Sequence, residues 1–248
     1  MTKLNTLLAT LLLAGTSFAG TSTCTSCTPT APVPTGSYAN TVFAGYDFRH
    51  DSYYMHGGIQ HDLNGNMGDG GLYLRAFTGF GSYNYDTIPG AGHTTGQLFD
   101  ADLGLGYRLP VGSFVLGAYA GAHLRDRNLT AIDPANPVGT DWGARFVLDA
   151  HGSLGAFDIG LIGQYSTIEN AIWTRARVGY KVCERVTVGP EFIYLNDAQF
   201  NERRVGGFIK IATCPMSALT LAAGYADYSG RGTADTSMYG SVGFSVNF

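Results

Sequence analysis

The chain has 248 residues, of which 45% are hydrophobic and only 14% are charged, with a formal net charge of −4. This balance excludes an intrinsically disordered chain, which needs low hydrophobicity and high net charge. The acidic charge also argues against a protein that binds nucleic acid. The 35 glycines and the 12% of aromatic residues are instead typical of tightly curved β-strands with aromatic girdles.

Residues 1–19 are expected to be a secretory signal peptide. Lys3 supplies the basic start, Leu4–Ala14 the apolar stretch and Ser17–Ala19 the small residues that precede cleavage before Gly20. An uncleaved membrane anchor is the alternative, but the apolar run is shorter than the ~20 residues that a membrane span needs. Thr16 stands where a lipoprotein would carry its cysteine, so a lipid anchor is not expected.

Residues 20–37 are rich in threonine, serine and proline and predict an extended, flexible periplasmic tail. Cys24 and Cys27 form a C-x-x-C motif in this tail. A thioredoxin-like redox motif would need a strand-to-helix context, and a zinc site would need a second pair of ligands at finger spacing. Export to an oxidising compartment therefore favours a local disulfide between these two cysteines.

From residue 38 to residue 248 the sequence predicts one β-barrel, because apolar residues alternate with small or polar ones in segments of about ten residues. In Leu98–Leu109, Leu103 and Leu105 share one face with other apolar residues, and Asp100 and Asp102 share the opposite face with Arg108. About twelve strands are expected, near Thr41–Arg49, Ser52–Leu63, Gly71–Tyr85, Leu98–Leu109, Phe114–Leu124, Asp141–Ala150, Phe157–Ser166, Ala171–Val182, Val186–Leu195, Arg204–Thr213, Ala218–Tyr228 and Met238–Phe248.

The predicted connections are of two lengths. Short ones are expected at Pro110–Gly112, Gly152–Gly155 and Cys183–Arg185, and long ones at Asp86–Thr95 and Asp126–Gly139. Short periplasmic turns and longer outer loops are typical of outer-membrane barrels. An even strand number also returns both ends of the chain to the periplasmic side. The expected fold is therefore all-β, an up-and-down antiparallel transmembrane barrel of about twelve strands.

A soluble β-sandwich is the alternative, because it also alternates apolar and polar faces. Glycines such as Gly104 and Gly106 would weaken exposed soluble strands, whereas a closed barrel uses them to bend around bulky neighbours. The last strand ends on its apolar face with Phe244, Val246 and Phe248, which is similar to the signal read by the outer-membrane insertion machinery. These features favour a barrel inserted in outer-membrane lipid.

Several glycine- and tyrosine-rich patches recur along the predicted strands: Gly71–Arg75 with Gly79, Gly81, Tyr83 and Tyr85, then Gly163–Ser166, Gly189–Glu191, Arg204–Phe208 and Gly224–Tyr225. These patches resemble the BcsS family, outer-membrane proteins linked to bacterial cellulose biosynthesis. The resemblance covers roughly Val42 to Phe248, without the tail. It implies a place beside a cellulose synthase operon and implies no catalytic residues.

The polar face of the strands would line the lumen with charges of both signs. A functional interpretation is a channel that contacts sugars or selects ions. The favoured interpretation is a ladder of ion pairs that fills the barrel and fixes its shape, because buried charges need partners and neither sign dominates. Pro190 also predicts a bulge or an unpaired position beside Glu191. The ladder comprises Arg75, Asp100, Asp102, Arg108, Arg145, Asp149, Arg175, Arg177, Lys181, Glu191 and Arg204, with Asp47 and Lys210 on the same wall.

A membrane enzyme acting on lipid or envelope sugar is the rival class. The chain has no G-x-S-x-G run, and none of its histidines lies in the sequence context of an outer-membrane lipase. His56 and His61 beside Asp62 lack a third metal ligand fixed by spacing. No catalytic residue, cofactor or metal is therefore expected.

Cys183 and Cys214 are expected at two short turns on the same rim. A disulfide needs Cα atoms ~4.4–6.8 Å apart, which neighbouring turns permit, so a disulfide between them is predicted.

Three functions remain open from the sequence. The first is an accessory component of cellulose biosynthesis, export or surface anchoring, whose partners would be outer-membrane lipid, the assembly machinery and components of the cellulose synthase complex or the glucan itself. The second is a general small porin or solute channel. The third is the membrane enzyme.

Overall fold

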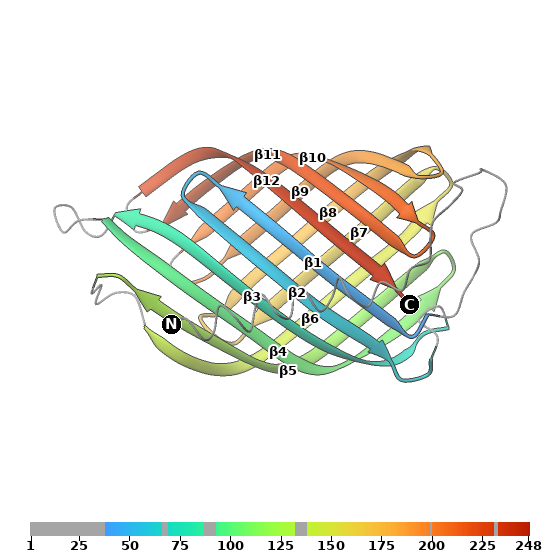
Figure 1. The fold of residues 1–248 in the computed structure, drawn as a ribbon, viewed down its shortest axis with the longest axis horizontal. Helices are drawn as coiled ribbons and strands as arrows, with labels where there is room; N and C mark the ends of the chain where they lie inside the picture. The colour runs from blue at the N-terminus through green and yellow to red at the C-terminus, as the bar shows by residue number, and fades with distance from the viewer. Residues whose placement is uncertain (1–37, 66–68, 87–92, 132–137, 199, 231–232) are drawn as a thin grey trace. The chain divides into compact units, whose positions relative to one another are not determined.

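The computed structural model describes residues 38–65, 69–86, 93–131, 138–198, 200–230 and 233–248. These residues form a closed barrel of twelve antiparallel strands, in which each strand pairs with its neighbours in sequence and β12 pairs with β1 (Figure 1). The predicted all-β, up-and-down barrel is therefore confirmed. The strands are β1 Asn40–Arg49, β2 Ser52–Asp62, β3 Gly71–Asp86, β4 His93–Val111, β5 Phe114–Leu129, β6 Gly139–Leu154, β7 Phe157–Ser166, β8 Ala171–Cys183, β9 Val186–Asn196, β10 Asn201–Cys214, β11 Ser217–Gly230 and β12 Thr233–Asn247.

Two predicted segments lie outside the described residues. They are the signal peptide at residues 1–19 and the tail at residues 20–37, with Cys24 and Cys27. Within the described residues, no helix is long and apolar enough to cross a membrane.

The barrel closes where its first and last strands meet. The backbone N–H of Asn40 donates to the carbonyl of Phe248 at 2.9 Å, and the N–H of Phe248 donates back to the carbonyl of Asn40 at 3.0 Å. Thr41 then pairs with Asn247, and the register continues without a shift to Arg49 and Tyr239. A closed ladder of this kind leaves no strand edge unpaired.

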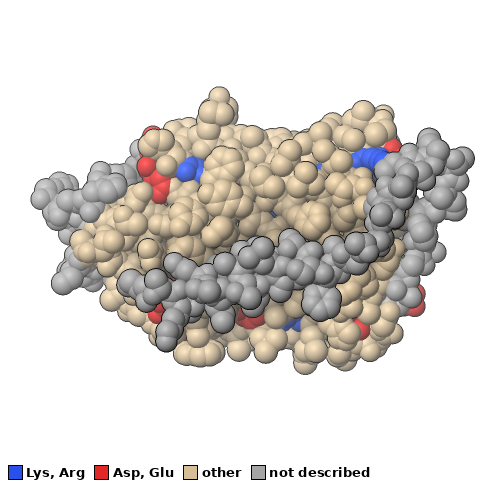
Figure 2. Space-filling model, viewed as in Figure 1, with Lys and Arg blue, Asp and Glu red and all other residues tan. Residues whose placement is uncertain are grey.

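The outer surface of the barrel is apolar and its interior is polar. Leu103 and Leu148 are 63% and 68% exposed on the outside, whereas their neighbours Asp102 and Val147 are buried inside. The face drawn in Figure 2 accordingly carries only small, scattered groups of charged side chains. This inverts the arrangement of a soluble protein and suits strands surrounded by lipid.

Large lumen side chains lie over glycines of the neighbouring strand. A Cβ atom added at Gly106 of β4 would lie 2.2 Å from the ring of Tyr73 on β3, and one added at Gly79 of β3 would lie 2.0 Å from the hydroxyl of Tyr54 on β2. A side chain at either glycine position would force the neighbouring tyrosine to move. The abundance of both glycine and tyrosine in the sequence follows from this packing.

The strands of the β3–β6 wall are longer than the apolar pattern predicts. The predicted long connections Asp86–Thr95 and Asp126–Gly139 lose residues to β4, β5 and β6. Apolar alternation ends where lipid contact ends, but backbone pairing continues, as between Gly96 and Leu129. The turn expected at Gly152–Gly155 is also displaced, because β6 runs on to Leu154.

Pro190 interrupts pairing on one side of β9 without a bulge. The β8–β9 ladder pairs Arg177 with Glu191 and next pairs Tyr180 with Val188, in the same register. On the other side of β9, Pro190 pairs with Gly207 of β10. The proline, which has no N–H, thus lies at an interruption of the β8 side of the strand.

Candidate functional site

A cavity of about 1340 Å³ lies inside the barrel and is lined by arginines, carboxylates and aromatic rings. Two groups of polar side chains on the inner wall bring opposite charges together. We call them the β4–β6 network, formed by Asp100, Asp102, His123, Arg125 and Arg145, and the β9–β12 network, formed by Arg177, Glu191, Glu202, Arg204 and Tyr239.

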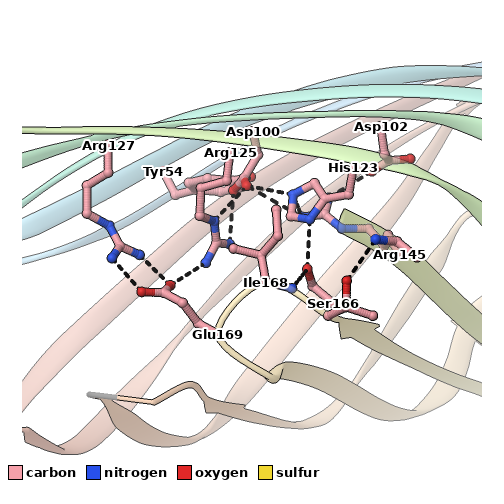
Figure 3. Close-up of polar contacts among 12 residues, drawn as sticks. Tyr54, Asp100, Asp102, His123, Arg125, Arg127, Arg145, Ser166, Ile168 and Glu169 are labelled. Atoms are coloured by element: carbon pink, nitrogen blue, oxygen red, sulfur yellow. Dashed lines mark hydrogen bonds and ion pairs between the residues drawn. The ribbon is translucent and has the colours of Figure 1, made fainter. Parts of the chain in front are cut away.

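Asp100 of β4 is the centre of the β4–β6 network (Figure 3). Its Oδ1 accepts a hydrogen bond from Nε of Arg125 at 2.9 Å and lies 2.8 Å from Nε2 of His123. Its Oδ2 accepts from the hydroxyl of Tyr54, on β2, at 3.2 Å. Only 2% of Asp100 is exposed, so these contacts replace the water that a carboxylate would otherwise bind.

Asp102 lies one step further along the same face of β4. Nη1 of Arg145, on β6, donates to its Oδ2 at 2.7 Å, and the hydroxyl of Tyr119, on β5, donates to its Oδ1 at 2.8 Å. Arg145 also approaches Oδ1 of Asp100, at 3.5 Å. The two carboxylates are therefore neutralised by arginines that reach across the inner wall from β5 and β6.

Ser166, His123 and Asp100 lie in the order of a proton-relay chain. Oγ of Ser166 is 2.7 Å from Nδ1 of His123, whose Nε2 is 2.8 Å from Asp100. A nucleophilic serine, however, must be free to reach a substrate. Here Oγ of Ser166 also accepts the backbone N–H of Ile168 at 3.1 Å, and Nη2 of Arg145 lies 2.6 Å from the same Nε2. The contacts suit an anchor for the β7–β8 turn better than a nucleophile.

The β7–β8 turn, residues 167–170, bends over the inner face of β6. A Cβ atom added at Gly143 of β6 would lie 2.8 Å from the side chain of Ile168. Glu169 of this turn accepts a hydrogen bond from Arg125 at 3.0 Å and two from Arg127, both on β5 (Figure 3). Burial opposes ionisation of Glu169, but the hydrogen bonds and charges of Arg127 and Arg125 outweigh it and hold the pKa of Glu169 below its usual range.

The β9–β12 network is organised by two buried glutamates. Glu191 of β9 accepts a hydrogen bond from the hydroxyl of Tyr239 at 3.1 Å and pairs with Arg177 of β8. The guanidinium of Arg177 also lies over the ring of Phe208, 5.1 Å from its centroid. Glu202 of β10 accepts from Nη1 of Arg49 at 3.1 Å and from Nε of Arg204 at 3.0 Å.

A family model described as "Cellulose biosynthesis protein BcsS" matches residues 41–248. The chain belongs to the BcsS family. The match runs from the second residue of β1 to the end of the chain, so the whole barrel is the BcsS-family unit and the resemblance seen in the sequence patches is confirmed.

Solved outer-membrane barrels share this fold at low sequence identity. The COG4313 outer membrane channel from Pseudomonas putida F1 is 12% identical, with a TM-score of 0.54 over 86% of this chain and 96% of that one. The translocator domain of autotransporter NalP from Neisseria meningitidis is 10% identical, with a TM-score of 0.51 over 87% and 91%. LpxR from Salmonella typhimurium is 11% identical, with a TM-score of 0.50 over 84% and 100%. At these identities the likeness concerns the fold alone. No curated protein sequence matches the chain.

The charges expected to form a lumen ladder take three kinds of position in this BcsS-family barrel. Asp100, Asp102, Arg145, Arg177, Glu191 and Arg204 lie in the two networks. Five others lie outside these networks, each beside a polar partner. Arg75 is 3.9 Å from Asp102, and Arg108 donates a hydrogen bond to Gln60. Asp149 is 3.6 Å from His151, Lys181 pairs with Asp158 at 3.1 Å, and Asp47 lies 3.8 Å from Arg204. Arg175 has no carboxylate at ion-pair distance in the part of the chain that the structure describes.

Several residues in or beside the β4–β6 network were not anticipated from the sequence. Tyr119 and His123 lie on the inward face of the predicted strand Phe114–Leu124, so its alternation alone could have revealed them. Arg125 and Arg127 lie beyond the predicted end of that strand, and a longer strand would have revealed them. Glu169 lies in a turn, where periodicity carries no information about which way a side chain points.

The predicted disulfide between Cys183 and Cys214 is not formed. Cys183 pairs with Val186 of β9, and Val186 pairs on its other side with Ile211 of β10, three residues before Cys214. Two strand spacings of ~4.7–4.9 Å already separate the cysteines by more than the ~7 Å that a disulfide tolerates. The prediction treated turns on one rim as neighbours and overlooked the width of β9.

No group of three or more histidine, cysteine, aspartate or glutamate side chains is arranged to hold a metal ion within the described ranges.

Proposed function

We propose that this BcsS-family barrel is a non-enzymatic outer-membrane protein that acts as an accessory component of cellulose biosynthesis, in export or surface anchoring of the polymer. The observation that carries the proposal is the family match over residues 41–248, which covers nearly the whole barrel. The apolar exterior, with Leu103 and Leu148 exposed, supports a location in lipid.

A scaffolding role is supported by how the lumen charges are used. The carboxylates of Asp100, Asp102, Glu191 and Glu202 each bind arginine, so none is free to act as a general acid or base. Ser166 is tied to the backbone of its own turn. The inner wall is therefore built to hold its shape.

The proposed partners follow from this placement. The apolar exterior would contact outer-membrane lipid, and the last strand, with Phe244, Val246 and Phe248, would engage the assembly machinery. We further propose that residues 1–19 direct export and that residues 20–37 form a periplasmic tether toward components of the cellulose synthase complex.

Deletion of the gene in its native host tests the proposal. We expect less cellulose retained at the cell surface, restored by the wild-type gene, while uptake of small solutes is unchanged. Unchanged cellulose in the deletion strain would overturn the proposal.

A solute channel is the second candidate, and the cavity of about 1340 Å³ is the observation that favours it. A barrel of twelve strands lies between filled eight-stranded barrels and open sixteen-stranded porins. Ion-pair networks on its wall predict little steady conductance in planar bilayers. A large and stable conductance, with cellulose unaffected by deletion, would establish the channel instead.

A further inference from the structure

One arginine of the lumen lacks the partner that the others have. The neighbouring charges on β8, Arg177 and Lys181, pair with Glu191 and Asp158. In the described part of the chain, Arg175 makes no side-chain hydrogen bond or ion pair, and Glu191 and Asp47 attract it only at longer range. Arg175 is partly exposed and lines the cavity, so its guanidinium is available to a ligand in the lumen.

The surroundings of Arg175 combine an aromatic face with further hydrogen-bonding groups. Its guanidinium lies over the ring of Trp173, 5.4 Å from the centroid, and both side chains line the cavity. Gln164 of β7 is paired directly with Trp173, also lines the cavity, and likewise has no side-chain hydrogen bond in the described residues. The three side chains therefore bring together one aromatic ring, partly covered by a guanidinium, and two sets of polar atoms without a protein partner in the described residues.

Space is available in front of this surface. The cavity exceeds the ~300–1,000 Å³ typical of ligand pockets. On the same stretch of wall, a Cβ atom added at Gly160 of β7 would meet nothing within 4 Å. Gly160 pairs with Arg177, one inward-facing position from Arg175.

We propose that Gln164, Trp173 and Arg175 form a binding site for a neutral β-glucan chain on the inner wall of the barrel. The C–H face of a glucose ring would stack on Trp173, and Arg175 and Gln164 would hydrogen-bond to its hydroxyls. A neutral saccharide is expected rather than an acidic one because cellulose is an uncharged β-glucan, and the neighbouring base Arg177 is already paired with Glu191. This inference rests on the proposed role in cellulose biosynthesis and names the ligand of the lumen.

The chain contains two tryptophans, which gives the test a specific reporter. Trp142 lies on the outer face and is 72% exposed. In the full barrel carrying Trp142→Phe, the fluorescence reports Trp173 alone. Titration with cellohexaose should give a saturable change in that signal, with weaker effects from α-linked maltohexaose and from the acidic hexamer of galacturonate.

Variants of the site then separate binding from folding. Calorimetry measures the dissociation constant for cellohexaose. Trp173→Ala should raise it at least about tenfold, and Arg175→Gln and Gln164→Ala should raise it less. Trp142→Ala is the matched control and should bind as the wild type does. All variants should keep the heat-modifiable migration of a folded barrel.

Equal binding by Trp173→Ala, no saturable change with cellohexaose, or binding of the galacturonate hexamer alone would each overturn the inference. If deletion of the gene still alters cellulose in that case, the accessory role stands and only the lumen site is wrong. If cellohexaose binds as expected while deletion leaves cellulose unchanged, the site stands and the accessory role fails.

Discussion

Tyr239 of β12 reaches across two strands to donate a hydrogen bond to Glu191 of β9, at 3.1 Å. It passes over Gly224 of β11 and Gly206 of β10, where added Cβ atoms would lie 2.9 Å and 2.5 Å from its side chain. One tyrosine thus links four consecutive strands on the lumen side. Its path is open only because both intervening residues lack a side chain.

Removal of the Tyr239 hydroxyl should destabilise the barrel. Tyr239→Phe keeps the ring over the glycines but leaves Oε1 of buried Glu191 without this donor. Loss of a hydrogen bond to a charged group costs about 1.5–3 kcal/mol, so the free energy of unfolding in detergent should fall by that amount. Tyr225→Phe, on the exposed outer face, is the matched control and should change stability little. Equal stability of both variants would show that the bond contributes nothing.

Gly206 and Gly207 provide a second comparison, between adjacent residues of the same strand. A Cβ atom at Gly206 would lie 2.3 Å from the carbonyl oxygen of Ala223, whereas one at Gly207 would have its nearest neighbour at 3.6 Å. Gly206→Ala should therefore destabilise the barrel by about 1–3 kcal/mol through overpacking. Gly207→Ala should be tolerated. Thermal unfolding followed by heat-modifiable migration measures both, and a reversed order would contradict the proposed packing.

Glu169 should give the barrel an acid-sensitive component of stability. Its pKa is lowered in the folded state by Arg127 and Arg125 against the effect of burial. The ionised form therefore stabilises the fold above the ordinary glutamate pKa of about 4.3. This contribution is lost as the pH falls through the lowered folded-state pKa.

The measurement is the free energy of unfolding as a function of pH on the acid side of that value. Glu169→Gln should be less stable than the wild type at neutral pH, and the difference should shrink as the pH falls. Glu184→Gln, in the exposed β8–β9 turn, is the control and should keep the wild-type pH dependence. A pH-independent gap between Glu169→Gln and the wild type would refute the explanation.

The architecture could be predicted from the sequence because strand alternation is a local signal. Leu103 and Asp102 occupy opposite faces whatever their partners are, so the number of strands and the polarity of the two faces can be deduced without coordinates. The start of β4, the end of β5 and the start of β6 could not be predicted in this way. There Arg127 and its neighbours pair as strand although the apolar signal has ended.

The partners within the lumen could not be predicted for a different reason. The relative shift of strands that are not adjacent in sequence decides which polar side chains meet, as with Tyr239 and Glu191. Side-chain length matters as well, since Arg145 reaches from β6 to Asp102 on β4. The sequence predicts that charges of both signs face inward but not which of them, such as Arg175, remains without a partner.

Phe248 should be required for assembly of the barrel. Its side chain is 49% exposed on the apolar outer face, and its backbone closes the barrel against Asn40. Phe248→Asp places a charge on that face at the end of the terminal strand, so outer-membrane levels and the heat-modifiable form should fall several-fold. Asn247→Asp introduces the same charge at the adjacent inward-facing position and should assemble nearly normally. Quantitative immunoblots of outer-membrane fractions decide the matter, and equal levels of the two variants would show that the final aromatic residue is not read as an assembly signal.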